Sequence, residues 1–89
     1  MARITVEHLR ESLFRVTVDE QSGRSVHEVT ARREHVERYA PGAAAERLIE
    51  ASFEFLLERE PKEAILSRFE LPVIERYFPD YPRSIRAKL

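Results

Sequence analysis

The chain has 89 residues, a formal net charge of −1 and no cysteine, and 43% of its residues are hydrophobic while 35% are charged. This length predicts a single domain over residues 1–89, and the composition is too apolar for a disordered chain. A general nucleic-acid binder carries a strong basic excess, which is absent. Without cysteine there is no disulfide framework or thiolate metal site. No long apolar run or signal-peptide core occurs, which predicts a cytoplasmic protein without membrane contact.

Residues 3–31 are predicted to form a three-stranded antiparallel meander. Polar and apolar side chains alternate along two stretches of this segment, the pattern of half-buried strands. A two-residue turn at Ser22-Gly23 is expected to join the second and third strands. The turns predict registers in which Val6 lies opposite Val16, and Val16 lies opposite Val29. Both registers place the apolar side chains on one face of the sheet.

The rest of the chain is predicted to be helical. The expected elements are a short helix over 32–40, one long helix over 43–60, and short helices over 61–69, 72–78 and 82–88. Prolines at positions 61, 72 and 82 suit the first turns of new helices. The long helix carries an apolar stripe wide enough to face both the sheet and another helix. The predicted fold is therefore a two-layer α+β domain, with a common core of Val6, Val16, Val29, Leu48, Phe53, Leu56 and Ile65.

One stretch of the C-terminal half resembles a known group of sequences. Residues 51–81, ASFEFLLEREPKEAILSRFELPVIERYFPDY, are similar to the signature stretch of short, uncharacterised bacterial proteins. The resemblance extends more loosely to the strand-rich first third of the chain. It implies a natural bacterial origin and brings no activity, substrate or cofactor with it.

Four glutamates form a ladder along the predicted long helix. They follow one another at i, i+4 spacing: Glu46, Glu50, Glu54 and Glu58. Like charges at this spacing repel each other weakly. A di-metal helical bundle would also need Glu-x-x-His pairs, and no histidine follows His35. A solvent-exposed face is the favoured interpretation, and a docking stripe for arginines of this chain or of a second chain is the alternative. No metal site and no cofactor are predicted.

The histidines and serines give no catalytic signature. The predicted registers place His8 and His27 on the apolar face of the two outer strands, ~9–10 Å apart, which is too far for one metal ion. Both are expected to be partly buried, with hydrogen-bond partners for their rings. No serine lies in a nucleophile elbow, and the two glycines, Gly23 and Gly42, form no phosphate-binding loop. The protein is predicted not to be an enzyme.

A basic and aromatic segment near the C-terminus is the candidate nucleic-acid site. Its residues would supply cations for phosphates and a ring for base stacking: Arg76, Tyr81, Arg83, Arg86 and Lys88. The favoured alternative is that the rings are part of the core and the arginines are solvated, because prolines hold this segment in short packed turns.

The preferred hypothesis is a small non-catalytic interaction or regulatory module that acts through protein–protein contacts. The alternatives are a nucleic-acid-associated regulator or antitoxin-like protein that uses the basic segment and, as a minor one, an accessory subunit of an enzyme. The helices carry more apolar side chains than a small sheet can cover, which predicts a homodimer formed through an exposed patch around Phe55 and Leu66. In this dimer, the Glu46–Glu58 ladder would face arginines of the other chain.

Overall fold

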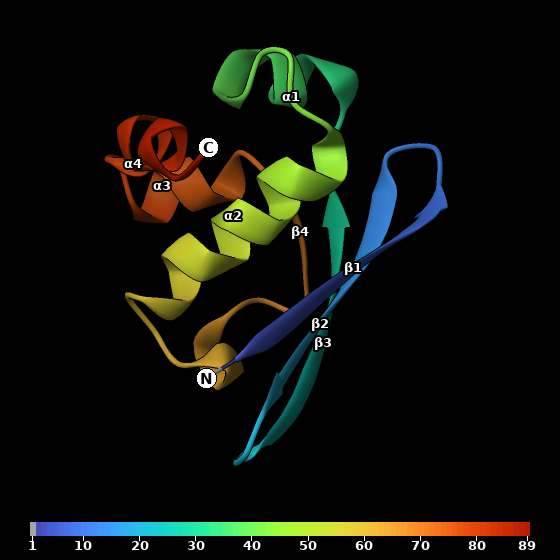
Figure 1. Ribbon diagram of the computed structural model, residues 1–89, viewed down its shortest axis with the longest axis vertical. Helices are drawn as coiled ribbons and strands as arrows, with labels where there is room; N and C mark the ends of the chain where they lie inside the picture. Colours follow the sequence, from blue (N-terminus) through green and yellow to red (C-terminus); the bar gives the residue numbers. More distant parts are fainter. Residues whose placement is uncertain (1) are drawn as a thin grey trace.

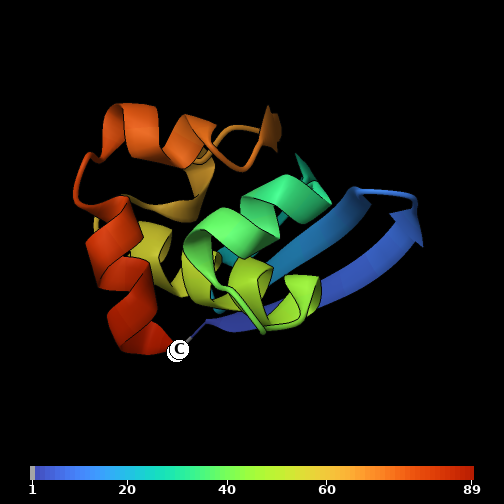
Figure 2. The ribbon, with the colours of Figure 1, turned by 90° about the horizontal axis from the view of Figure 1, so that it is seen from above.

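The computed structural model describes residues 2–89 as a four-stranded sheet with helices packed on one face (Figures 1 and 2). The strands follow the order β1-β2-β3-β4 across the sheet, with bounds β1 Arg3–Arg10, β2 Leu13–Glu20, β3 Gly23–Thr30 and β4 Arg68–Glu70. The first three strands are antiparallel, which confirms the meander. The prediction of a three-stranded sheet was wrong, because β4 adds to the free edge of β3 in parallel.

The registers of the meander agree with the prediction at one hairpin and differ at the other. Val6 lies opposite Val16, as predicted. On the other side Val16 lies opposite His27 instead of Val29, because the turn falls at Gln21-Ser22, one residue earlier than expected. Gly23, at φ 139°, then begins the third strand in a conformation that side chains disfavour. Moving the turn by one residue shifts the pairing of β2 with β3 by two residues. A shift of two residues leaves each side chain on the same face of the sheet, so the apolar face is unchanged.

The first three α-helices are shorter than predicted, and the fourth begins one residue earlier than predicted. Their bounds are α1 Arg33–Tyr39, α2 Ala45–Leu57, α3 Val73–Tyr77 and α4 Tyr81–Lys88. Helix α2 has 13 residues, so the single long helix over 43–60 was a wrong prediction. It ends before Glu60, because the residue ahead of a proline disfavours the helical conformation, and here Pro61 follows.

The helix predicted over 61–69 is absent. A 3-10 turn, Lys62–Ala64, is followed by extended residues that lead into β4. The amide of Glu28 donates to the Ser67 carbonyl at 2.8 Å, and the amide of Leu71 donates to the Thr30 carbonyl at 2.9 Å. These bonds give the backbone amide of Glu28 and the carbonyl of Thr30, on the free edge of β3, their hydrogen-bond partners. Pairing with an existing strand therefore prevails over the helical spacing of the apolar side chains in this segment.

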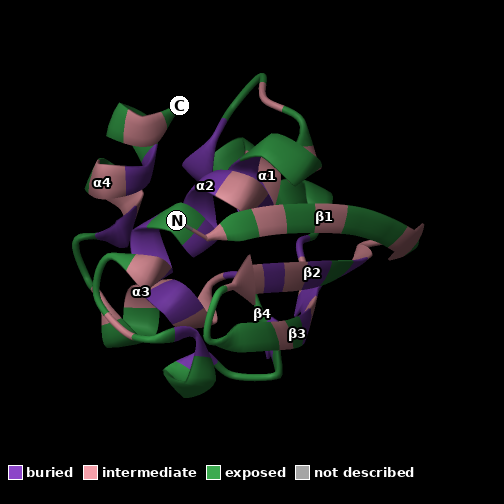
Figure 3. Cartoon of the chain, turned by 60° about the horizontal axis from the view of Figure 1, so that its bottom comes forward, coloured by how far each residue is buried: buried purple, intermediate pink, exposed green. Residues whose placement is uncertain are grey.

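The core lies between the sheet and α2. Six of the seven residues predicted to share it are buried: Val16, Val29, Leu48, Phe53, Leu56 and Ile65. The seventh, Val6, is half-buried because β1 is an edge strand. Figure 3 shows this difference, since β1 alternates between exposed and intermediate residues while β2 carries buried ones. Among residues 2–89, no helix has both the length and the apolarity needed to cross a membrane.

Two buried tyrosines tie the helices to one another. The Tyr39 hydroxyl donates to Glu75 at 2.7 Å, which links α1 to α3. Ser52 donates its hydroxyl proton to the Leu48 carbonyl at 2.7 Å. The Tyr81 hydroxyl, 2.7 Å from Ser52 Oγ, must therefore be the donor of the bond that joins α4 to α2. Burial, assisted by Glu75, raises the pKa of Tyr39 from 10.0 to about 12, and burial also raises the pKa of Tyr81.

These tyrosines predict a loss of stability at alkaline pH. Because the folded-state pKa lies above the ordinary value of 10.0, the stabilisation is complete below pH 10 and is lost as the pH rises towards the Tyr39 pKa of about 12. We expect the melting temperature to fall steadily between pH 10 and 12 in thermal melts. A Tyr39→Phe variant has one such phenol fewer and should show a smaller decrease. An equal decrease in both proteins would contradict the assignment to Tyr39.

Candidate partner-binding pocket

An open pocket of about 270 Å³ lies among the end of α2, the segment that leads into β4, and α3. Its walls are mainly apolar and include Leu56, Ile65, Leu66, Phe69, Ile74 and Tyr77. Leu56, Ile65, Phe69 and Ile74 are buried and belong to the core. The pocket is therefore an opening onto the core, and its base is rigid because those side chains also pack against the rest of the domain.

The rim of the pocket holds exposed apolar side chains. Leu66 is 47% exposed and Tyr77 is 67% exposed, and both line the pocket. In residues 2–89 only two other large hydrophobic residues are exposed, Val26 at 49% and Leu89 at 45%. Exposed apolar side chains gathered around a hollow, instead of scattered singly, are typical of a binding site.

Short backbone contacts hold the two walls in place. The amide of Glu60 donates to the Leu56 carbonyl at 2.9 Å, which fixes the residue after α2. On the opposite wall, the amide of Phe78 donates to the Ile74 carbonyl at 2.8 Å at the end of α3. Glu75 of the same helix accepts the Tyr39 hydroxyl bond, so α3 is anchored to the body of the domain.

His27 anchors the rim from inside the sheet. The residue is 3% exposed, and its Nδ1 donates to the Leu66 carbonyl at 2.8 Å. The Ser25 hydroxyl lies 2.8 Å from Nε2 and donates to it when the ring is neutral. The sequence predicted a partly buried His27 with a hydrogen-bond partner, but it gave no indication of its contact with Leu66. The side chain that links β3 to the pocket is thus a histidine of the sheet.

His8 lies in a different environment from His27. It is exposed, its ring stacks on Phe14 with centroids 4.7 Å apart, and Nε2 donates to the Glu11 carbonyl at 2.6 Å. Its predicted partial burial was wrong, because β1 is an edge strand and its pairing with β2 becomes irregular after His8. No group of three metal-ligating side chains occurs in the part of the chain that the structure describes.

Glu60 is the one charged residue that lines the pocket. Its side chain is half-buried, and desolvation by the surrounding apolar side chains raises the pKa of the carboxyl. Within residues 2–89, no basic side chain forms an ion pair with it; neighbouring Arg59 binds Glu58 and Asp80 instead. The pocket thus combines an apolar base with an anion that has no countercharge. Glu60 lies four positions after Leu56 and directly before Pro61, but its other sequence neighbours are charged, so no local signal set it apart.

The predicted partner-binding residue Phe55 does not lie on the surface. It is fully buried, with Phe78 and Tyr81 at ring-centroid distances of 5.8 and 5.3 Å. The guanidinium of Arg59 covers the ring at 3.7 Å from its centroid. The expectation of an exposed Phe55 was wrong because α4 packs against the flank of α2 where this residue lies. Leu66, the other residue of the predicted patch, is exposed and lies on the pocket rim.

The glutamate ladder is partly neutralised within the chain. Glu50 pairs with Arg47 at 3.2 Å, and Glu58 accepts a hydrogen bond from Lys88 at 2.7 Å. The bond from Lys88 is the main cause that lowers the pKa of Glu58. Glu46 and Glu54 are exposed. Two of the four glutamates therefore contact arginines of this chain, Glu50 with Arg47 and Glu58 with Arg59.

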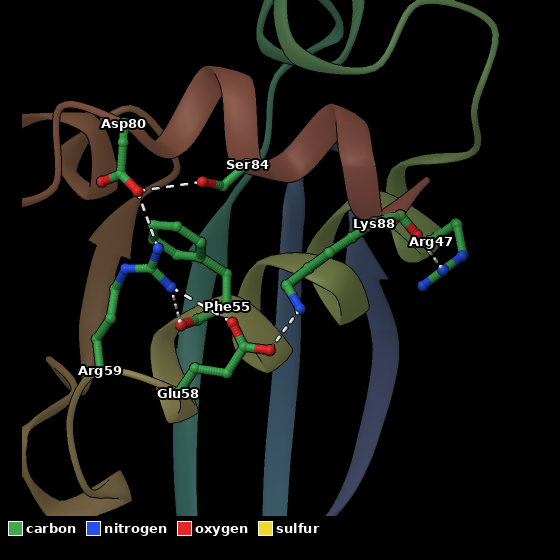
Figure 4. Close-up of polar contacts among 7 residues, drawn as sticks. All are labelled: Arg47, Phe55, Glu58, Arg59, Asp80, Ser84 and Lys88. Atoms are coloured by element: carbon green, nitrogen blue, oxygen red, sulfur yellow. Dashed lines mark hydrogen bonds and ion pairs between the residues drawn. The ribbon is translucent and has the colours of Figure 1, made fainter.

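Ionic contacts attach α4 to α2 (Figure 4). Arg59 donates to Asp80 at 2.9 Å, and Arg47 donates to the Lys88 carbonyl at 3.0 Å. Lys88 itself is only 22% exposed and is engaged with Glu58. Tyr81, at the start of the helix, is fully buried. The two attachment points lie at opposite ends of α4, so the whole helix is fixed on the domain.

This arrangement separates the residues predicted to bind nucleic acid. Arg76, Arg83 and Arg86 are exposed. Tyr81 is fully buried and cannot stack on a base, and Lys88 already has an anionic partner. The predicted interleaving of cations and stacking rings is therefore not presented at the surface by these five residues.

The chain matches no protein family, no curated protein and no solved structure. Its class is therefore defined by its own architecture, an α+β domain with helices on one face of a mixed four-stranded sheet. The resemblance of residues 51–81 to short bacterial proteins stays a prediction.

Proposed function

We propose that the protein is a small non-catalytic interaction module that binds a protein partner through the pocket. The bound segment presents a large apolar side chain next to a lysine or arginine. The observation that carries this proposal is the combination of exposed Leu66 and Tyr77 with Glu60 around one open hollow. The apolar anchor would fill the base of the pocket, and the cation would neutralise Glu60.

The energetic terms favour such a two-part ligand. Burying one leucine or phenylalanine side chain contributes ~1.5–3 kcal/mol, which alone gives weak binding. Glu60 is already partly desolvated, so a cation placed beside it removes a cost that the free protein bears. An anionic ligand would add a second negative charge at the same place. The charge of the ligand should therefore decide its affinity more than the shape of its apolar part.

The test uses two synthetic hexapeptides that share a central leucine and differ only in the next residue, lysine or glutamate. Backbone amide shifts of the ¹⁵N-labelled protein report binding. We expect the lysine peptide to shift the amides of Leu66 and Tyr77 and to bind roughly 3- to 10-fold more tightly, because the exchange replaces repulsion by attraction for a total of ~1 kcal/mol. Shifts on another face, or none with either peptide at millimolar concentration, would overturn the proposal.

Two variants serve as controls. Glu60→Gln should keep the apolar binding and remove the preference for lysine, while Leu66→Glu should weaken binding of both peptides. The preference should also depend on pH. It requires the ionised carboxylate, so it is complete well above the raised pKa of Glu60 and disappears as the pH falls through it.

A further inference from the structure

The outer edge of β1 is a long strand edge without a partner in the described chain. Strand β1 contains eight residues and lies at one end of the strand order. Outside the β1–β2 ladder, no residue from 3 to 10 takes part in a backbone–backbone hydrogen bond with any other part of residues 2–89. The strand contains no proline, and its one irregularity in pairing falls after His8. An extended edge of this kind is a template for another strand.

The opposite edge of the sheet does not offer the same template. Strand β4 has only three residues and ends before Leu71-Pro72. Proline cannot donate to a ladder, and a strand of three residues gives few bonds. If the sheet is extended, the extension therefore takes place at β1. This edge is also remote from the pocket, which Phe69 of β4 lines at the other end of the sheet.

We infer that β1 pairs with β1 of a second copy in an antiparallel, two-fold arrangement, which makes one continuous eight-stranded sheet. The second copy is the partner because the side chains of β1 complement themselves. In the register centred on Thr5, Arg3, which forms no ion pair within residues 2–89, lies opposite Glu7 of the other copy, and the symmetric pair repeats the contact. Glu7 would make this contact in addition to its pair with Arg15 of β2, at 3.1 Å in the same chain. On the helix-covered face, Ile4 lies opposite Val6 of the other copy.

Burial and exposure agree with this register. Arg3, Thr5 and Glu7 are exposed and lie on the face of the sheet that the helices leave open. Ile4 and Val6 are half-buried and pack against the edge of the core. A neighbouring β1 would cover their outer sides, and cross-strand aliphatic and opposite-charge pairs each stabilise a sheet. The half-burial of Ile4 and Val6 is what an incomplete sheet edge produces.

Neighbouring registers lack this complementarity. Side chains of paired residues lie on the same face of the sheet, so the pairing can shift only by an even number of residues. Moving the two-fold axis from one residue to the next produces the smallest such shift, two residues. Centring the pair on Val6 places Thr5 opposite Glu7 and removes both arginine–glutamate contacts. Centring it on Glu7 brings two like charges together, which is destabilising. The charges of the strand thus select the register centred on Thr5.

The test is a charge exchange read by sedimentation equilibrium at tens to hundreds of micromolar protein. The parent should show a concentration-dependent mass that rises from 10.5 kDa towards twice that value. Arg3→Glu and Glu7→Arg should each weaken dimerisation at least threefold, and the double exchange should restore it. A mass of 10.5 kDa throughout, or a dimer that neither single change weakens, would overturn the inference.

A second variant checks the register. The chain has no cysteine, so Thr5→Cys introduces a single thiol that the proposed pairing places opposite its own copy. Cross-strand Cβ atoms lie ~4.5–5.5 Å apart, and mild oxidation should therefore yield a disulfide-linked dimer. Thr17→Cys, on the same face of the neighbouring strand β2, is the control and should stay monomeric on a non-reducing gel. Cross-linking of Thr17→Cys but not Thr5→Cys would exclude this register. Leu66→Glu should leave the dimer intact, which separates this interface from the pocket.

Discussion

Replacing Phe53 by alanine is expected to reduce the free energy of unfolding by ~3–5 kcal/mol. The side chain is fully buried and lies at the centre of the core, with the rings of His27 and Phe69 at centroid distances of 5.3 and 6.1 Å. It therefore connects α2 to β3 and β4 at once. A domain of this size has on the order of 5–10 kcal/mol of stability in total, so this variant should be partly or wholly unfolded at 37 °C.

Urea and thermal unfolding followed by circular dichroism measure this effect. Phe53→Leu keeps most of the volume and should lose less than ~1.5 kcal/mol. Tyr77→Ala removes a side chain that is 67% exposed, and it should change stability by no more than ~0.5 kcal/mol. An unfolding curve of Phe53→Ala that superimposes on the parent curve would refute the central position of this ring.

The meander was predictable because the pattern that identifies its strands lies within short stretches of the sequence. Alternation of polar and apolar residues identified the strands. Because of the same alternation, the wrong register predicted for the second hairpin still placed the right side chains on the apolar face. The two candidate turns, Ser22-Gly23 and Gln21-Ser22, differ by one residue, and both are compatible with the same face. The choice between them depends on which residue takes the positive φ, and Gly23 takes it at the first position of β3.

Strand β4 was not predictable by the same means. It has three residues, Arg68 to Glu70, which is too few for a period of two to be distinguished from a helical spacing. Its existence depends on the free edge of β3, a feature some forty residues earlier in the chain. The helical spacing of Ile65 and Phe69 is real, but both side chains reach the core from extended backbone. Long-range pairing decided the local conformation here.

The candidate site was predictable only at Leu66. Helical spacing showed that the C-terminal half carries more apolar side chains than one face can cover, and Leu66 is one that remains exposed. The same spacing could not show that α4 covers the flank of α2 where Phe55 lies. Glu60 and Tyr77 line the same pocket because the chain between them passes through β4. No local sequence pattern shows that path.

The difference between Phe55 and Leu66 gives a matched pair of glutamate substitutions with opposite expected results. Phe55→Glu places a carboxylate where the phenyl ring is fully buried between Phe78 and Tyr81. An uncompensated buried charge costs several kcal/mol, and the lost aromatic packing adds ~3–5 kcal/mol. Arg59 lies over the ring, but it already binds Asp80 and would offset only part of this cost. We expect Phe55→Glu to be unfolded at 25 °C.

Leu66→Glu should instead fold like the parent, because the side chain is 47% exposed and only its backbone carbonyl is used, by His27. Its melting temperature should lie within a few degrees of the parent value, since surface substitutions usually change stability by less than ~0.5 kcal/mol. Far-UV circular dichroism and thermal melts of the two variants measure the contrast. A folded Phe55→Glu protein would show that α4 does not seal this flank of α2. An unfolded Leu66→Glu protein would show that the pocket rim belongs to the core, and the rim would then be unable to receive a partner.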